Sequence, residues 1–367
     1  MSVVGIICEY NPFHNGHLHH LQKAKEIANG DVVIAILTGY FSMRGDISVL
    51  NKYDKIKTAI DSGVDITIEL PYLLGTQNAD IFAYNSVYLL NKMGVQTIVS
   101  GSESCDIDKI KKIYEIEKNI DFQNQIKNNL KTGSSYRKSY TDALTQYDLT
   151  LNSNDMLNIK YYEAIQKINP NITLTLIQRI NNDYNDKTLN DTNIQSATSL
   201  RLTENIKGYV PDAVNEIYEE KGFYNLNEFS MILKHLISTT DLSNIHMATE
   251  GIENSFKTDF KNIDDLIEKL TTKRYTSSRI RRLITYILTN TKKDSCFDVE
   301  NTPVRVTGFS DFGQKYLSLK KKDTKYFTRF VEGINSIYDK EFLIAKIFSN
   351  IYDEDFIKLE QKLPYKK

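Results

Sequence analysis

The chain has 367 residues, 25% of them charged, and a formal net charge of −1. This length is enough for two domains of ordinary size, and the composition is typical of soluble globular proteins. No apolar run approaches the roughly 20 residues of a membrane span, and no basic segment precedes an apolar one at the N-terminus, so we expect neither a membrane partner nor a signal peptide. Three scattered cysteines without a Cys-x-x-Cys pair argue against a zinc site or disulfides. These features predict a cytoplasmic protein, and we expect no DNA partner.

The first two hundred residues alternate between strand and helix patterns, which is typical of a parallel sheet with crossover helices. Buried strands are expected at residues 3–8, 31–38, 65–70, 95–100 and 172–177, and helices at residues 17–28, 51–62, 79–93, 106–130 and 156–168. After about residue 205 the strand patterns end and long helical patterns follow. We therefore expect an α/β fold, with a Rossmann-like parallel five-stranded sheet in residues 1–204 and a C-terminal all-α domain in residues 205–367.

The segment Asn11-Pro12-Phe13-His14-Asn15-Gly16-His17 lies between the first expected strand and the first expected helix. Backbone N–H groups and the positive end of a helix favour an anion at such a turn. Gly16 lets the backbone approach that anion, and His14 and His17 add two side-chain donors suited to phosphoryl chemistry. The alternative is a pair of surface histidines at a helix start. The His-x-Gly-His spacing in this context resembles the signature of the nucleotidyltransferase superfamily.

A second group of polar residues, Ser196-Ala197-Thr198-Ser199-Leu200-Arg201, resembles an element that nucleotidyltransferases carry late in the catalytic domain. The hydroxyls of Ser196, Thr198 and Ser199 can cap a helix start and also bind phosphate oxygens. Arg201 can hold the β- and γ-phosphates. The alternative is an ordinary helix cap with a surface arginine. The loop from Thr38 to Asp46 follows the second strand and contains two glycines, Arg44 and Asp46; it is either close to a ligand or a plain connection.

Four blocks extend this resemblance over nearly the whole chain: Gly5–Leu18, Thr38-Gly39 with Arg44-Gly45-Asp46, Gln195–Ser199, and Thr272–Thr276. Together they are similar to the bacterial tRNA(Met) cytidine acetate ligase family. The resemblance implies a nucleotidyltransferase-like catalytic domain in residues 1–204 and a helical tRNA-binding domain in residues 205–367. It also implies that ATP activates acetate as acetyl-adenylate, and that the acetyl group passes to the exocyclic amine of the wobble cytidine of elongator tRNA(Met).

The resemblance also implies which residues bind ATP. They are Ile7, Cys8, Glu9, Tyr10, Asn11, Pro12, Phe13, His14, Asn15, Gly16, His17, Leu18, His19 and His20, with Gly101, Asn154 and Arg179 as further contacts. Residues 152–155 depart from the family's usual turn, but the motif retains Asn154. In the first step an acetate oxygen attacks the α-phosphorus, so His14, His17 and Arg201 are the expected catalytic residues, together with a bound Mg²⁺ whose ligands the sequence does not define.

Basic residues gather between Lys273 and Lys293, a stretch with no acidic residue. Basic side chains neutralise phosphates, so we expect a tRNA-binding surface made by Lys273, Arg274, Arg279, Arg281 and Arg282. The alternative is a solvated helix face. Two other functions stay open. The first is a cofactor-synthesising adenylyltransferase of the NAD or coenzyme A pathway type, and the second is an RNA-binding protein whose nucleotide pocket is only regulatory.

Overall fold

The structure, a computed structural model, describes residues 2–180, 194–321 and 324–367. Its strands are β1 (Val3–Cys8), β2 (Val32–Thr38), β3 (Ile66–Leu70), β4 (Thr97–Ser102), β5 (Thr173–Gln178), β6 (Val304–Phe309), β7 (Tyr326–Phe327) and β8 (Tyr365–Lys366). The helices of the first half are α1 (Asn15–Ala28), α2 (Lys52–Asp61), α3 (Tyr72–Gly75), α4 (Ala79–Lys92), α5 (Ile107–Glu117), α6 (Ile120–Lys131), α7 (Tyr136–Thr145) and α8 (Ser153–Ile168). Those of the second half are α9 (Ala197–Arg201), α10 (Asp212–Lys221), α11 (Ser230–Thr239), α12 (Ile252–Ser255), α13 (Ile263–Leu270), α14 (Ser277–Leu288), α15 (Asp311–Lys320), α16 (Ser336–Ser349) and α17 (Phe356–Glu360), with 3₁₀ turns at Leu226–Phe229 and Leu242–Asn244.

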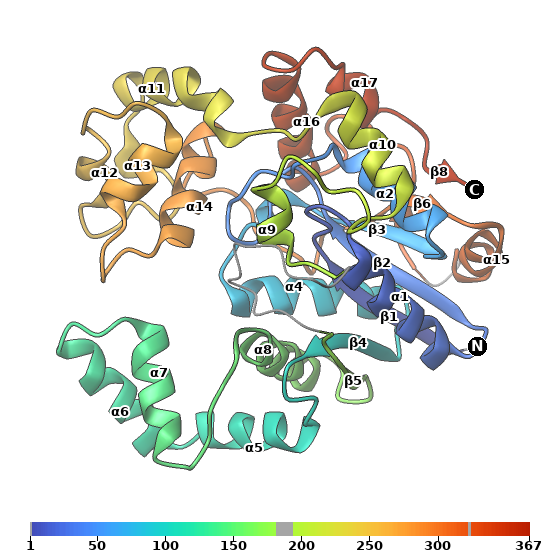
Figure 1. The fold of residues 1–367 in the computed structure, drawn as a ribbon, viewed down its shortest axis with the longest axis horizontal. Helices are drawn as coiled ribbons and strands as arrows, with labels where there is room; N and C mark the ends of the chain where they lie inside the picture. The colour runs from blue at the N-terminus through green and yellow to red at the C-terminus, as the bar shows by residue number, and fades with distance from the viewer. Residues whose placement is uncertain (1, 181–193, 322–323) are drawn as a thin grey trace.

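One mixed sheet organises the fold (Figure 1). Its parallel core has the order β5-β4-β1-β2-β3, so the five expected strands are confirmed and pair as a doubly wound sheet. The order of connection reverses between β1 and β4. Ligands of such sheets bind outside the carboxyl ends of the strands at that reversal.

Alternate residues of the central strands face two different cores, as the two-residue period of a strand requires. Val4, Ile6 and Cys8 of β1 face α1 and α2 in one core. Val3 of β1 and the isoleucines of β2 and β3 face the other core, which contains α4, α8, α11, α13, α14 and α16. The strands are buried on both faces because helices cover both, which explains their continuous apolar sequences.

The strand count is a correction to the sequence-based expectation. Strands do not end near residue 205, because β6 pairs antiparallel with β3, and β7 and β8 both pair with β6, which makes the sheet eight-stranded. Residues 205–367 are therefore largely but not wholly helical. Two helical lobes, α5–α7 and α11–α14, extend from the same side of the sheet and stand apart from one another (Figure 1). Among the described residues, no helix combines the length and the apolar character that crossing a membrane requires.

A buried ion cluster fastens the C-terminal segments to the sheet. Lys52 of α2 lies 2.5 Å from Glu69 of β3 and 3.3 Å from Glu341 of α16, and it also contacts Glu360 of α17. Arg305 of β6 lies 2.9 Å from Glu69 and 2.6 Å from Glu360. All five side chains are at most 3% exposed. The cluster joins α2 and β3 to β6, α16 and α17, which lie more than two hundred residues later in the sequence, so it holds the C-terminal segments against the sheet.

Candidate active site

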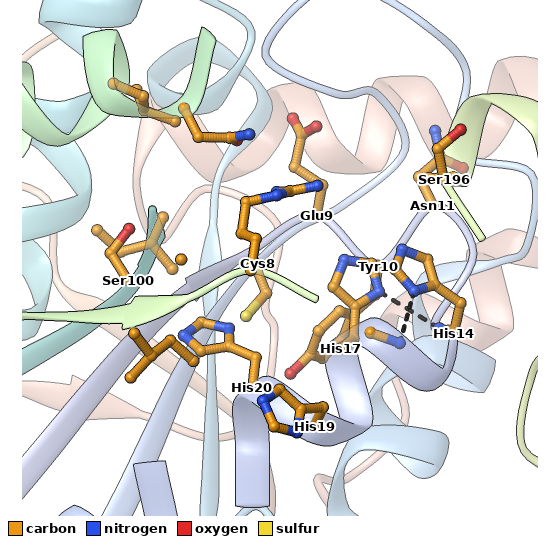
Figure 2. A pocket seen from close by; sticks show the side chains of 18 of the residues that line it. Cys8, Glu9, Tyr10, Asn11, His14, His17, His19, His20, Ser100 and Ser196 are labelled. Atoms are coloured by element: carbon orange, nitrogen blue, oxygen red, sulfur yellow. Dashed lines mark hydrogen bonds between the residues drawn. The ribbon is translucent and has the colours of Figure 1, made fainter. Parts of the chain in front are cut away.

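A cavity of about 320 Å³ lies at the carboxyl ends of β1, β4 and β5, where the order of the sheet reverses. The segment after β1 and the start of α1 form one side of it, and residues of α4, α8 and the loop before α9 complete it. Figure 2 places His14, His17, Asn11 and Ser196 together at one side of the view and Ser100 of β4 at the other. The volume lies within the range of small-molecule sites.

The two histidines of the signature stack on each other at the start of α1 (Figure 2), with ring centroids 3.8 Å apart. Nδ1 of His14 accepts the N–H of Gly16 at 3.0 Å, and Nδ1 of His17 accepts the N–H of His14 at 3.3 Å. Because both Nδ1 atoms accept, each neutral ring carries its proton on Nε2. A Cβ on residue 16 would lie 2.8 Å from Cε1 of His14. Glycine at this position therefore leaves room for the imidazole of His14.

Both imidazoles are neutral in the ligand-free protein. Burial lowers the pKa of His14 to about 3, and the charges of Arg179 and Arg201 lower it further. Burial also lowers the pKa of His17 well below its usual range, with His14, His20 and Arg179 acting in the same direction and a hydrogen bond to the Pro12 backbone opposing them. Bound phosphates would oppose the two arginines and raise both pKa values. The pair is thus arranged to donate hydrogen bonds to an anion without first carrying a positive charge.

The sequence pattern suggested that the first N–H groups of α1 are free to bind an anion, but in the structure they are already hydrogen-bonded. The N–H of Asn15 donates to the Tyr209 carbonyl at 3.0 Å, and the N–H groups of Gly16 and His17 bond to His14. Attraction for an anion at this turn therefore depends on the helix dipole, the imidazoles and the arginines.

Arg201, on α9, is held against the signature loop. Its Nη1 donates to the carbonyl of Asn11 at 2.8 Å, and its Nη2 contacts the hydroxyl of Thr198 at 3.3 Å. Ser196 caps α9 by accepting the N–H of Ser199 at 3.0 Å. The capping expectation is confirmed. Ser196 and Arg201 line the cavity, whereas Thr198 and Ser199 support α9 from outside its lining.

Most of the residues expected to bind ATP line the cavity. They are Ile7, Cys8, Glu9, Tyr10, Asn11, His14, Gly16, His17, His19, His20, Gly101, Asn154, Arg179 and Ser196. Pro12, Phe13, Asn15 and Leu18 are not among the lining residues. Phe13 instead packs edge-on against Tyr10 at 4.6 Å, and the side chain of Asn15 bonds to the Gly208 carbonyl, so these two residues hold the loop. The ligand contacts of every residue in this set stay predictions.

Three further residues expected to bind ATP, Asn154, Gly101 and His20, are held in place by neighbouring residues. Asn154 is fixed by Glu103, to which both its backbone and its side-chain N–H groups donate. Gly101 packs against Arg179, whose Cγ would lie 3.2 Å from a Cβ at residue 101. His20 bonds through Nε2 to the Val99 carbonyl at 3.0 Å.

Sequence reasoning missed the apolar wall of the cavity. Phe82 of α4, Met156, Leu157 and Tyr161 of α8, and Ile177 of β5 all line it. They form a surface suited to a flat apolar ring such as a purine base. Their positions in separate elements gave no signal at the level of motifs. Arg44 and Met43 also line the cavity, so the second loop forms part of its wall.

Glu9 is the one carboxylate among the described residues that line the cavity. Burial raises its pKa, and its Oε1 accepts the N–H of Met43 at 2.6 Å. The carboxylates of Glu69, Glu341 and Glu360 lie close enough together for a metal ion, but Lys52 already occupies the space between them. The residues of the cavity therefore fit an Mg²⁺ that arrives on a nucleotide's phosphates and keeps most of its water, rather than an all-protein metal site.

The expected tRNA-binding residues lie on α14 and the turn before it, and most have acidic partners. Arg274 and Arg279 lie 3.3 Å and 3.6 Å from Glu250, and Arg281 lies 3.1 Å from Asp46. The acid-free stretch of sequence is thus partly neutralised in space. These pairs are partly exposed and therefore weak, so a phosphate could replace the acidic partner at small cost. Lys273 is exposed, and Arg282 is half-buried.

Comparisons with known proteins agree with this geometry. A family model described as HIGH Nucleotidyl Transferase matches residues 1–362. The tRNA(Met) cytidine acetate ligase of Oceanobacillus iheyensis is 34% identical, over 99% of this chain and 97% of the relative. The enzyme of the same name from Fusobacterium nucleatum is 37% identical, over 96% and 95%. The crystal structure of apo Thermotoga maritima TmcAL superposes with a TM-score of 0.86 at 28% identity, and the one bound with alpha-thio ATP with a TM-score of 0.83 at 28%; each covers 100% of this chain and 99% of the other.

Proposed function

We infer that this chain is an ATP-dependent tRNA-modifying ligase. It belongs to the HIGH nucleotidyl transferase family and, within that family, to the tRNA(Met) cytidine acetate ligases. It activates acetate as acetyl-adenylate and acetylates the exocyclic amine of the wobble cytidine of elongator tRNA(Met). The observation that carries this function is the stacked His14–His17 pair at the start of α1, facing a cavity that also holds Arg179 and Arg201.

The cavity accounts for the binding of ATP. Its apolar wall of Phe82, Tyr161 and Ile177 receives the base, and the phosphates lie against His14, His17 and Arg201. The structural likeness to a protein bound with alpha-thio ATP supports this assignment. An Mg²⁺ carried by the phosphates would neutralise part of the charge that develops during transfer.

The first step joins a carboxylate oxygen of acetate to the α-phosphorus and breaks the bond to the leaving pyrophosphate. The Nε2–H groups of His14 and His17 donate to phosphate oxygens as their charge grows, and the fixed charge of Arg201 holds the departing pyrophosphate. In the second step the cytidine amine attacks the acetyl carbon, the bond to AMP breaks, and the amine loses a proton. Acetyl-adenylate is a mixed anhydride and already reactive, so this step requires no covalent enzyme intermediate.

The lobe formed by α11–α14 supplies the RNA-binding surface in this proposal. Lys273, Arg274, Arg279, Arg281 and Arg282 contact phosphates of the tRNA on and beside α14. Residues 1–204 act as the catalytic domain and residues 205–367 as the tRNA-binding domain, with β6 and β8 returning to the catalytic sheet. A tRNA substrate and a reducing environment for three free cysteines both favour the cytoplasm, with neither a membrane nor DNA as a partner.

Pyrophosphate exchange tests the first step alone. Purified protein is incubated with ATP, labelled pyrophosphate and Mg²⁺, with and without acetate, and no RNA is added. We expect label to enter ATP only when acetate is present. Exchange without acetate, or with nicotinamide mononucleotide or phosphopantetheine in its place, would assign the site to a cofactor-synthesising adenylyltransferase instead.

A further inference from the structure

A short hairpin links the nucleotide cavity to the helix expected to bind RNA. Residues 40–48 turn back on themselves, with a bridge between Phe41 and Ile47 and a bond from the N–H of Ser48 to the Tyr40 carbonyl at 2.7 Å. The side chain of Asn11 in the signature loop donates to the Ile47 carbonyl at 2.9 Å and accepts the N–H of Val49 at 2.8 Å. One side of the hairpin is therefore fixed to the loop that carries His14.

The tip of the same hairpin rests directly on α14. Gly45 has a φ of +81°, and a Cβ there would lie 2.5 Å from the backbone nitrogen of Arg282. Asp46 pairs with Arg281 at 3.1 Å. Only glycine permits both this backbone conformation and this approach. The position of the hairpin tip against α14 is thus fixed by direct contact between the two backbones.

Arg44 at this tip brings a third positive charge beside two arginines of α14. It lines the cavity and is half-buried, while Arg282 lies outside the described lining. Burial lowers the pKa of Arg282, and the neighbouring charges of Arg279 and Arg44 lower it further, so the three cations repel one another. Within the described parts of the chain, the buried Nε atoms of Arg279 and Arg282 have no hydrogen-bond partner. Among the nearby acids, Asp46 and Glu250 are engaged with Arg281, Arg274 and Arg279, and Glu9 faces Arg44 from within the cavity.

We propose that Arg44 and Arg282 together bind a backbone phosphate of the acceptor RNA at the mouth of the cavity, next to the nucleotide that receives the acyl group. This proposal rests on the proposed function and assigns Arg44 to the RNA rather than to ATP. One phosphate relieves the repulsion of the arginine group and bridges the hairpin to α14. The rigid hairpin then sets the distance from that phosphate to His14 and His17, which makes Arg44 a positioning residue for the transfer step.

Arg44→Gln tests the proposal, with the exposed Arg329→Gln as the matched control. Without RNA, we expect the acetate-dependent pyrophosphate exchange of Arg329→Gln to equal that of wild type, and that of Arg44→Gln to fall far less than its acetylation of tRNA. With tRNA(Met), we expect kcat/KM for acetylation to fall roughly 10- to 100-fold for Arg44→Gln only, as befits the loss of a charged hydrogen bond. The slope of log binding constant against log salt concentration should shrink by about 0.7 to 0.9, the value for one phosphate contact. Arg44→Lys should restore part of both losses, and Arg44→Gln combined with Arg282→Gln should lose less than the sum of the two.

Two results would overturn the proposal. Loss of exchange in Arg44→Gln equal to the loss of acetylation would assign Arg44 to the triphosphate, and an unchanged salt slope with unchanged kcat/KM for tRNA would remove it from the RNA site. Failure of the proposed function is distinguishable, because wild type would then not acetylate tRNA at all. The salt slope of tRNA binding would still report on Arg44 in that case. Thermal melting of each variant checks that the hairpin change has not unfolded the protein.

Discussion

Replacing Lys52 by methionine tests the buried ion cluster, because it removes one cation and keeps the length of the side chain. In the native protein, Lys52 and Arg305 balance the carboxylates of Glu69 and Glu360. Burial and the neighbouring carboxylates raise the pKa of Glu341 to about 8, so its side chain is largely protonated at pH 7. Without Lys52, one further carboxyl must either stay charged and unpaired or take up a proton.

Proton uptake is the cheaper of these outcomes, and its cost can be worked out. A glutamate has an ordinary pKa of 4.5. Holding it protonated at pH 7 costs 2.5 pH units, or about 3.4 kcal/mol at about 1.36 kcal/mol per unit. This agrees with the roughly 3–5 kcal/mol that breaking one side of a buried ion pair costs. The variant's folded state binds one more proton than its unfolded state above pH 4.5, so its penalty must grow as pH rises.

The assay is urea denaturation of wild type and Lys52→Met at pH 5.5 and pH 7, with Lys57→Met as the control. Lys57 lies on the same helix, and its pair with Asp61 is half-exposed, so we expect a change of at most about 0.5 kcal/mol. For Lys52→Met we expect a penalty of about 3 kcal/mol or more at pH 7 and roughly 2 kcal/mol less at pH 5.5. A penalty equal to that of Lys57→Met, or one that does not change with pH, would refute the claim that losing Lys52 forces a buried carboxyl to take up a proton.

Three further predictions concern single groups. Glu341→Gln fixes the neutral form of this side chain. Since the native Glu341 holds a proton that the unfolded chain has lost, the stability of wild type relative to this variant should fall by up to about 1.4 kcal/mol per pH unit from pH 5 to 8. A difference in denaturation midpoints that does not change with pH would contradict this prediction. His14, with a pKa of about 3, should show no imidazole titration by NMR between pH 5 and 8 in the ATP-free protein, whereas a midpoint near the ordinary value of 6.5 would mean that the ring is solvated. His17→Ala should reduce acetate-dependent pyrophosphate exchange roughly 100- to 1,000-fold with tRNA affinity within about twofold, and equal loss of both would make the histidine structural.

The parallel core of the fold could be predicted from sequence because its signals are local. Strands buried on both faces are continuous apolar runs, and the observed bounds of β1 to β5 lie within about two residues of those expected. The long helix expected at residues 106–130 is divided into α5 and α6, with Asn119 capping the second helix. Caps of this kind are short-range features that a periodicity argument overlooks.

Strand β6 could not be predicted, for a physical reason. Arg305 interrupts its apolar pattern and Gly308 weakens strand propensity. Arg305 is tolerated there because Glu69 and Glu360, from distant segments, pair with it. Gly308 is needed because a Cβ would lie 2.8 Å from Ile56. Both features depend on contacts between segments far apart in sequence.

The candidate site divides in the same way. The signature loop, Ser196 and Arg201 carry motif signals, and the structure brings them to one cavity. The residues of the apolar wall belong to segments with no chemical motif, and only the tertiary fold places them beside the histidines. Arg44 belongs to a block that resembles the family, but its role could not be assigned before the fold placed it at the cavity. Likewise, the basic stretch around α14 reads as unpaired in sequence, but Asp46 and Glu250 meet it in space.

Transfer of labelled acetate to tRNA tests the central claim most directly. Purified protein, ATP, Mg²⁺ and labelled acetate are incubated with tRNA(Met), and the RNA is digested and its nucleosides separated. We expect the label in N4-acetylcytidine alone, dependent on ATP, and absent when the wobble cytidine is replaced by uridine. Label that stays in acetyl-adenylate, or that reaches the uridine-substituted tRNA equally, would contradict the account.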